Sequence, residues 1–130
     1  MRSQPSPAER GSAVVDFVLV MVVLVPFVLG IVQVGLVLHV RNTLTAAATD
    51  GARSAATLGS TPADGVERAQ ELIRGSLADR YADDVTASFT SVSGVPATEV
   101  VVRARVPALG ILGPSIELTM EGHAVQEVAP

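Results

Sequence analysis

The sequence predicts an α+β fold, in which a long N-terminal transmembrane helix extends out of the membrane and a second, amphipathic helix packs on a small three-stranded antiparallel sheet. Three observations lead to this prediction. An apolar run fills residues 17–40, apolar residues recur at helical spacing over residues 62–79, and apolar and polar side chains alternate from Val85 onward. We therefore expect three segments: a leader over residues 1–11, the transmembrane helix and its extension over residues 12–59, and a small α+β domain over residues 60–130.

The apolar run predicts the membrane helix. No charged residue lies between Asp16 and Arg41. A bilayer core about 30 Å thick is crossed by roughly 20 apolar residues in a helix, and residues 17–40 meet that requirement. The alternative is a cleavable secretory signal with its cleavage site at the small residues 46–48, although the apolar region of such a signal usually has about 7–15 residues.

Asp16 lies at the start of the apolar run, one helical turn beyond Ser12. A carboxylate inside the bilayer costs on the order of 2.5–3.5 kcal/mol on insertion scales, and more when it is deep. Two readings follow from this cost. Asp16 either stays wet at the headgroup boundary or meets a cation inside an assembly.

Other residues interrupt the apolar run. Pro26 removes one helical hydrogen bond, so we expect a kink there. Gly30, Gln33 and Gly35 form a small polar patch in the outer half of the helix. In lipid, Gln33 would seek a hydrogen-bond partner on a neighbouring helix, or it is simply tolerated.

An alanine-rich stretch continues the helix to about Leu58, because Ala is the strongest helix former. Ala47, Gly51, Ala55 and Gly59 recur every four residues, which places them on one face of that helix. Such a face of small residues lets a second helix approach closely. The alternative is that this face packs against the protein's own domain.

The second helix begins with a recognisable cap, since Thr61 can act as N-cap, Pro62 as N1 and Asp64 as N3. We expect it to run over residues 62–79. The alternation then predicts three half-buried strands joined by short turns, which favours an antiparallel meander. The strands fall near residues 85–89, 99–106 and 116–121, the turns at 93–96 and 109–114, and a loose tail follows residue 125.

Composition excludes several classes of function. The chain has a net charge of −4, and a mildly acidic chain does not suit nucleic acid. It has no cysteine, which excludes disulfides and thiolate metal sites. His39 and His123 are far apart in sequence, and Asp83 with Asp84 fits a solvated turn. We therefore expect no catalytic residues, no metal, no cofactor and no small-molecule substrate.

Two short stretches resemble the TadE-like family, minor pseudopilins of the tight-adherence (Flp-type) pilus machinery. RGSAVVDF at residues 10–17 is similar to the family's RGSAxxEF opening, and AATDGAR at residues 47–53 is similar to its AAxxGAR segment. Between them, Gly30 and Gly35 lie where the family often has a glycine-rich patch with an acid. In this chain Gln33 replaces that acid, and Asp16 stands where the family has Glu.

The resemblance implies a pilin-like architecture and cleavage between Gly11 and Ser12 by a prepilin peptidase. Asp16, followed by Phe17, would then be fifth in the mature chain and could pair with the new ammonium group of Ser12 on an adjoining subunit. The implied protein is non-catalytic and spans the inner (cytoplasmic) membrane once, with its N-terminus cytoplasmic and its C-terminal domain extracytoplasmic. The implied partners are the prepilin peptidase, other pilins or pseudopilins, and the pilus assembly platform.

Two other functions remain open from the residues alone. The chain could be an unprocessed, signal-anchored extracytoplasmic domain that binds a partner and never polymerises. It could also be an enzyme tethered by its anchor, a class that the missing catalytic constellation disfavours.

Overall fold

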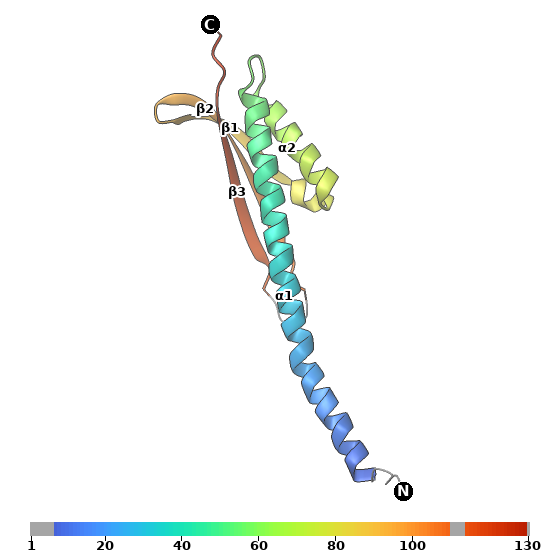
Figure 1. Cartoon of the computed structure of the whole chain (residues 1–130). Helices are drawn as coiled ribbons and strands as arrows, with labels where there is room; N and C mark the ends of the chain where they lie inside the picture. The colour runs from blue at the N-terminus through green and yellow to red at the C-terminus, as the bar shows by residue number, and fades with distance from the viewer. Residues whose placement is uncertain (1–6, 110–113, 130) are drawn as a thin grey trace.

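The structure is a computed structural model that describes residues 7–109 and 114–129, with side chains from residue 11 onward. Its elements, in chain order, are helices α1 (Pro7–Ala56) and α2 (Pro62–Ser76), the 3₁₀ helix η1 (Asp79–Ala82), and strands β1 (Asp84–Val92), β2 (Val95–Val106) and β3 (Ile116–Val125). Figure 1 shows α1 as a long rod whose N-terminal half stands alone, with every other element gathered along its C-terminal half. This arrangement confirms the predicted α+β class.

Helix α1 is a single element of 50 residues that continues through Pro26. The helix begins at Pro7, within the predicted leader, because proline is well tolerated in the first turn of a helix. It ends at Ala56, close to the expected end near Leu58. The rest of the leader lies outside the described residues.

The three strands form an antiparallel meander in the order β1-β2-β3. All three strands are longer than the alternation suggested, and a turn at Ser93 and Gly94 joins β1 to β2. Both turn residues have positive φ, 52° and 80°. A two-residue hairpin turn of this kind matches the right-handed twist of the strands, so Val95 and Pro96 belong to β2 rather than to the turn.

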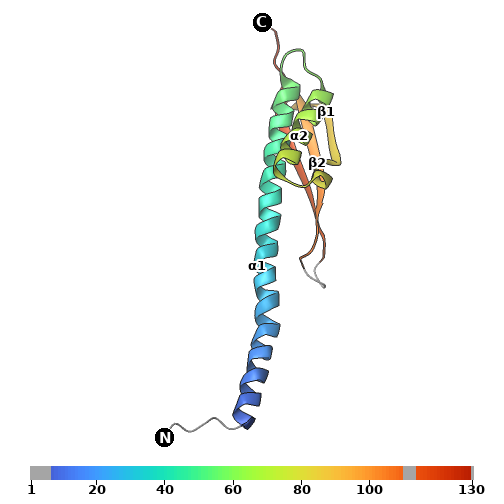
Figure 2. The same ribbon diagram turned by 90° about the vertical axis from the view of Figure 1, so that its right-hand side faces the viewer.

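Helix α2 starts as the capping pattern predicts. The carboxylate of Asp64 accepts hydrogen bonds from the backbone N–H of Thr61 at 2.6 Å and from its hydroxyl at 2.9 Å. The helix ends at Ser76, earlier than expected, and η1 then leads into β1. α2 therefore occupies one side of the domain, and Figure 2 shows it packed beside α1 and in front of the sheet.

The core lies between the inner face of the sheet, α2 and the C-terminal half of α1. It includes the end of the apolar run, because Val40 and Leu44 of α1 are fully buried. The part of residues 17–40 nearest the domain is thus core rather than lipid-facing surface. Composition alone did not separate the two, since lipid and protein core select the same side chains. The other fully buried large side chains are Ile73, Val100, Val102, Val106 and Thr98.

The backbones of α1 and β3 approach very closely at Gly122. A Cβ atom at that position would lie 2.3 Å from the carbonyl carbon of Ala48 and 2.5 Å from the nitrogen of Thr49. Only glycine allows this approach without displacing one of the two elements. Gly122 therefore sets the distance between the sheet and the helix that carries it.

The segment after β3 is held in place, so the expectation of a loose tail was wrong. The backbone N–H of Glu127 donates to the carbonyl of Ala56 at 2.9 Å, and its carboxylate accepts from the N–H of Leu58 at 3.2 Å. The N–H of Gln126 donates to the carbonyl of Pro96 at 3.0 Å. The tail thus satisfies backbone groups that are left open at the end of α1.

Candidate membrane and assembly site

The free half of α1 exposes an apolar surface on all sides. Residues 11–32 are all exposed except for Met21, which is half-buried. The most apolar window of the helix has a mean hydropathy of 2.9 and no buried residue. Exposure of so much apolar surface to water would be very unfavourable, and a bilayer removes that cost. Among the residues that the structure describes, one helix is therefore long and apolar enough to anchor the chain in a membrane.

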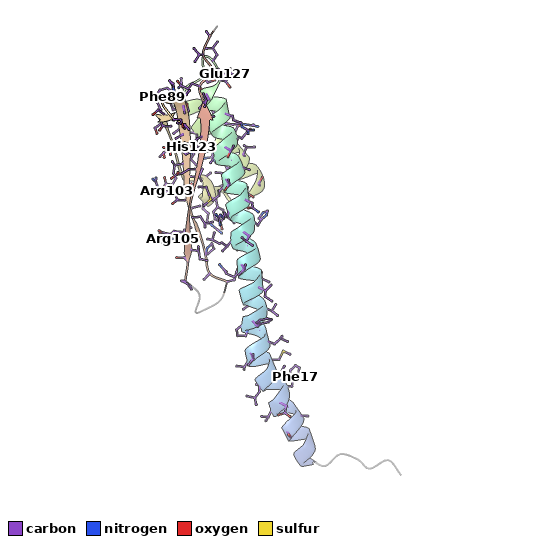
Figure 3. All side chains as sticks on the ribbon, turned by 60° about the vertical axis from the view of Figure 1, so that its left-hand side comes forward. Phe17, Phe89, Arg103, Arg105, His123 and Glu127 are labelled. Carbon is purple, nitrogen blue, oxygen red and sulfur yellow. The ribbon has the colours of Figure 1, made fainter. Side chains whose placement is uncertain are left out.

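Gly11, Ser12, Asp16 and Phe17 lie together on the first described turns of this free helix. All four are exposed, and Figure 3 shows Phe17 pointing away from a part of α1 that no other element reaches. The structure gives Asp16 no partner among the described side chains. The headgroup region or another chain can supply a partner for the carboxylate.

Gln33 receives its hydrogen bonds from within the chain. Its side-chain nitrogen Nε2 donates to the carbonyl of Pro107 at 3.2 Å, and its oxygen Oε1 accepts from the N–H of Leu109 at 2.7 Å. Both bonds link α1 to the connection between β2 and β3. The amide therefore anchors the sheet at a defined height on the helix, a role that the sequence pattern did not reveal.

The glycines beside Gln33 are different. A Cβ atom added at Gly30 or Gly35 would meet nothing within 4 Å, so this part of the helix surface is open. The structure brings Gln33 to the chain's own domain and leaves the two glycines free. A close helix neighbour from another chain could still pack there.

The face of small residues farther along α1 is covered by α2. Ala47 and Ala55 are 1% and 2% exposed, and a Cβ atom at Gly51 would lie 2.6 Å from the carbonyl oxygen of Gly65. Of the two alternatives raised by the sequence, the structure has the second, in which this face packs against its own domain. These residues hold the domain on the helix and are not accessible to another chain.

A broad cavity of about 940 Å³ opens between α1 and α2 on the other side of this contact. Three arginines contribute to its lining, and one of them, Arg68, forms an ion pair of 2.9 Å with Asp50. The other two are Arg41 and Arg53. The cavity is a groove of mixed polar and apolar lining on the domain side of the apolar surface.

The outer face of the sheet carries paired charges. Nε2 of His123 lies 3.0 Å from the carboxylate of Glu99, directly across β2 and β3, and Glu121 is close enough for the three residues to hold a metal ion. The exposed cross-strand pair needs no metal to explain it. His39 is on α1 and does not join this group. The sequence contained both partners, but only the strand register brings them together.

Comparison with known proteins finds a similarity in the N-terminal part of the chain. Residues 11–53 match the family model described as TadE-like protein. No curated protein and no solved structure matches the chain. The match confirms the resemblance noted above and covers the exposed helix and its alanine-rich extension, while α2 and the sheet lie outside it. Residues 11–53 are thus similar to the TadE-like family, and they include the exposed apolar helix that is long enough to anchor the chain in a membrane.

Proposed function

We propose that the chain is a non-catalytic pseudopilin-like membrane protein that takes part in assembling a tight-adherence type pilus or a related secretion apparatus. A prepilin peptidase cleaves it between Gly11 and Ser12. The observation that supports this most is the family match, which starts at Gly11 and continues along the exposed helix. The N-terminus is cytoplasmic, the folded domain is on the far side of the inner membrane, and the partners are the peptidase, other pilins or pseudopilins, and the assembly platform.

Asp16 is placed to pair with the charged group that the cleavage creates. Cleavage creates an ammonium group on Ser12, and a carboxylate one turn away on a neighbouring subunit can pair with it. Pairing offsets the desolvation of both charges when the helices come together in a low-dielectric environment. The helix around Asp16 is exposed on every side, so a neighbouring subunit can reach the carboxylate without moving the domain.

The open glycines indicate where a neighbouring helix would pack. Gly30 and Gly35 leave room for close approach, whereas Ala47, Gly51 and Ala55 are already covered by the chain's own domain. The contact with other subunits therefore lies along the membrane half of α1. The domain remains free to present its outer surface.

A second candidate function is an unprocessed, signal-anchored binding domain. The groove between α1 and α2, with Arg41 and Arg53 in its lining, is the observation that favours it. In that case the chain keeps its leader, and neither a peptidase nor a neighbouring subunit recognises Gly11 or Asp16. The two candidates therefore differ in the processing of the N-terminus.

A matched pair of glycine variants tests the proposal. Gly11→Val and Gly30→Val make the same change at two open positions of α1. Each is expressed with a prepilin peptidase, and the mass of the chain is measured. We expect wild type and Gly30→Val to lose the leader and Gly11→Val to retain it. Equal processing of the two variants would contradict the proposed cleavage site.

Asp16 is tested separately through assembly. We expect Asp16→Ala to reduce co-purification with other pilins or pseudopilins, and Asp16→Glu to preserve it, because the Glu variant keeps the charge. Unchanged co-purification of Asp16→Ala would show that the carboxylate does not contribute to subunit pairing.

A further inference from the structure

The apolar surface of α1 changes character at Gln33. Before this residue the side chains are exposed on all sides of the helix. Beyond it only one side of the helix stays exposed, where Val34 and Leu38 are 59% and 51% exposed. The other side is covered by the domain, where Val40 is buried. Gln33 is also the point at which the backbone of Pro107 and Leu109 meets the helix. Irregular backbone does not face the hydrocarbon core of a bilayer. The membrane surface therefore lies close to Gln33, and the β2–β3 end of the sheet faces the headgroups.

A cavity opens at this end of the domain. Its volume is about 440 Å³, and its lining comprises Arg80 of η1, Arg105 of β2, Pro107 and Ser115. Pro107 is the residue whose carbonyl accepts the bond from Gln33, so the cavity is at the height of the membrane surface. Figure 3 shows Arg105 on the part of the sheet nearest the bare helix. The site thus combines two guanidinium groups and a hydroxyl where phospholipid headgroups lie.

The two arginines are not equivalent. Arg80 lies over the ring of Tyr81, at 4.9 Å from the ring centroid, and forms no ion pair with any described residue. Arg105 is paired with Glu117, but both side chains are exposed, and such pairs are weak. A guanidinium group donates in a planar fork that matches the oxygens of a phosphate. Arg80 can therefore offer a phosphate a positive charge that no described carboxylate neutralises, and Arg105 can provide a second hydrogen-bond donor.

The surrounding charges favour a phosphate that is held at the membrane over one in solution. Asp79 adjoins Arg80 in η1, and Glu117 partly neutralises Arg105, so the site is only weakly attractive to a dilute anion. A lipid headgroup is already concentrated at this surface, which raises its effective concentration at the cavity.

We propose that this cavity binds the phosphate of an anionic phospholipid and so seats the domain on the membrane. Gln33 holds the sheet at the required height, and Arg80 with Arg105 contacts the headgroup. The proposal rests on membrane anchoring and not on cleavage at Gly11, so the mass measurements described above do not bear on it.

The test compares lipids on the full chain. The protein in detergent is titrated with phosphatidylglycerol or phosphatidylcholine, and bound lipid is counted by native mass spectrometry. We expect tighter binding of phosphatidylglycerol to wild type. Arg80→Gln should weaken it about fivefold, the effect of one basic side chain at an anionic surface. Arg74→Gln, an exposed change on α2 away from the cavity, should leave the affinity unchanged.

A folding check and a second variant separate loss of lipid binding from loss of the fold. Circular dichroism checks that Arg80→Gln is folded, and Arg105→Gln replaces it in the test if loss of the contact with Tyr81 unfolds the domain. Equal affinity of wild type for both lipids, or equal losses in Arg80→Gln and Arg74→Gln, would overturn the proposal. Binding of inorganic phosphate without a preference for phosphatidylglycerol would overturn the assignment to lipid.

Discussion

Replacing Gly122 by Ala is the sharpest test of how the domain is attached to α1. The added Cβ atom would lie 2.3 Å from the carbonyl carbon and 2.4 Å from the carbonyl oxygen of Ala48, whereas ordinary contacts begin at 3.4 Å. Because the atoms it meets belong to the helix backbone, no side-chain rotation relieves the overlap. The strand and the helix must separate by about 1 Å, which opens the core on both sides of the contact.

The expected cost follows from this geometry. Overpacking of a well-packed core costs about 1–3 kcal/mol, and we expect the upper end because both partners are backbone. With a urea dependence of about 1.5 kcal/mol per molar, a loss of about 3 kcal/mol lowers the unfolding midpoint by about 2 M. A small domain has a total stability of about 5–15 kcal/mol, so the change should be easy to measure.

Pulse proteolysis of the full chain in detergent and urea measures the midpoint. Gly75→Ala is the matched control, because Gly75 lies in α2 and a Cβ atom there meets nothing within 4 Å. It should leave the domain unchanged or stabilise it by up to about 1 kcal/mol, the difference in helix propensity between Gly and Ala. An unchanged midpoint for Gly122→Ala would refute the close contact between β3 and α1.

Three further changes test other contacts. Gln33→Leu removes both hydrogen bonds to the β2–β3 connection, so exchange of the Leu109 amide proton should accelerate about tenfold; unchanged exchange would mean that the amide does not hold the sheet. Hydrogen bonds from the backbone N–H of Thr61 and, to a smaller extent, from its hydroxyl hold the pKa of Asp64 below its ordinary value of 3.8. The ionised carboxylate therefore stabilises the folded state above pH 3.8, and this stabilisation is lost as the pH falls through the lower, folded-state pKa. Circular dichroism should show acid loss of α2 helicity in this range for wild type, and Asp64→Asn should lack that transition. Glu127→Ala removes the carboxylate that accepts from the backbone N–H of Leu58, so hydrogen exchange of that amide should become faster, whereas an equal rate would show that the carboxylate does not hold the segment after α1.

The local parts of the fold could be predicted because their causes are local. The cap formed by Thr61 and Asp64 depends on residues three apart, and the strands follow from alternation along a short stretch. The strand ends were less predictable. Positive φ at Ser93, a residue that rarely adopts it, makes the hairpin turn shorter than the sequence suggested.

The parts that could not be predicted depend on distant residues. Gln33 looked like a polar residue awaiting a neighbouring helix, yet its partners lie 74 and 76 positions away in the chain. Val40 looked like lipid-facing surface, yet the domain covers it. The pairing of Glu99 with His123 needed the strand register. Sequence patterns predicted which residues were unusual but not what each of them contacts.

Processing between Gly11 and Ser12 is tested by the N-terminal sequence or the intact mass of the chain after isolation from the native membrane. We predict a chain that begins at Ser12. A chain that begins at Met1 or Arg2 would contradict processing and favour an anchored binding domain. A chain that begins after Ala48 would contradict membrane anchoring itself, since it would lack the exposed helix and the buried residues Val40 and Leu44.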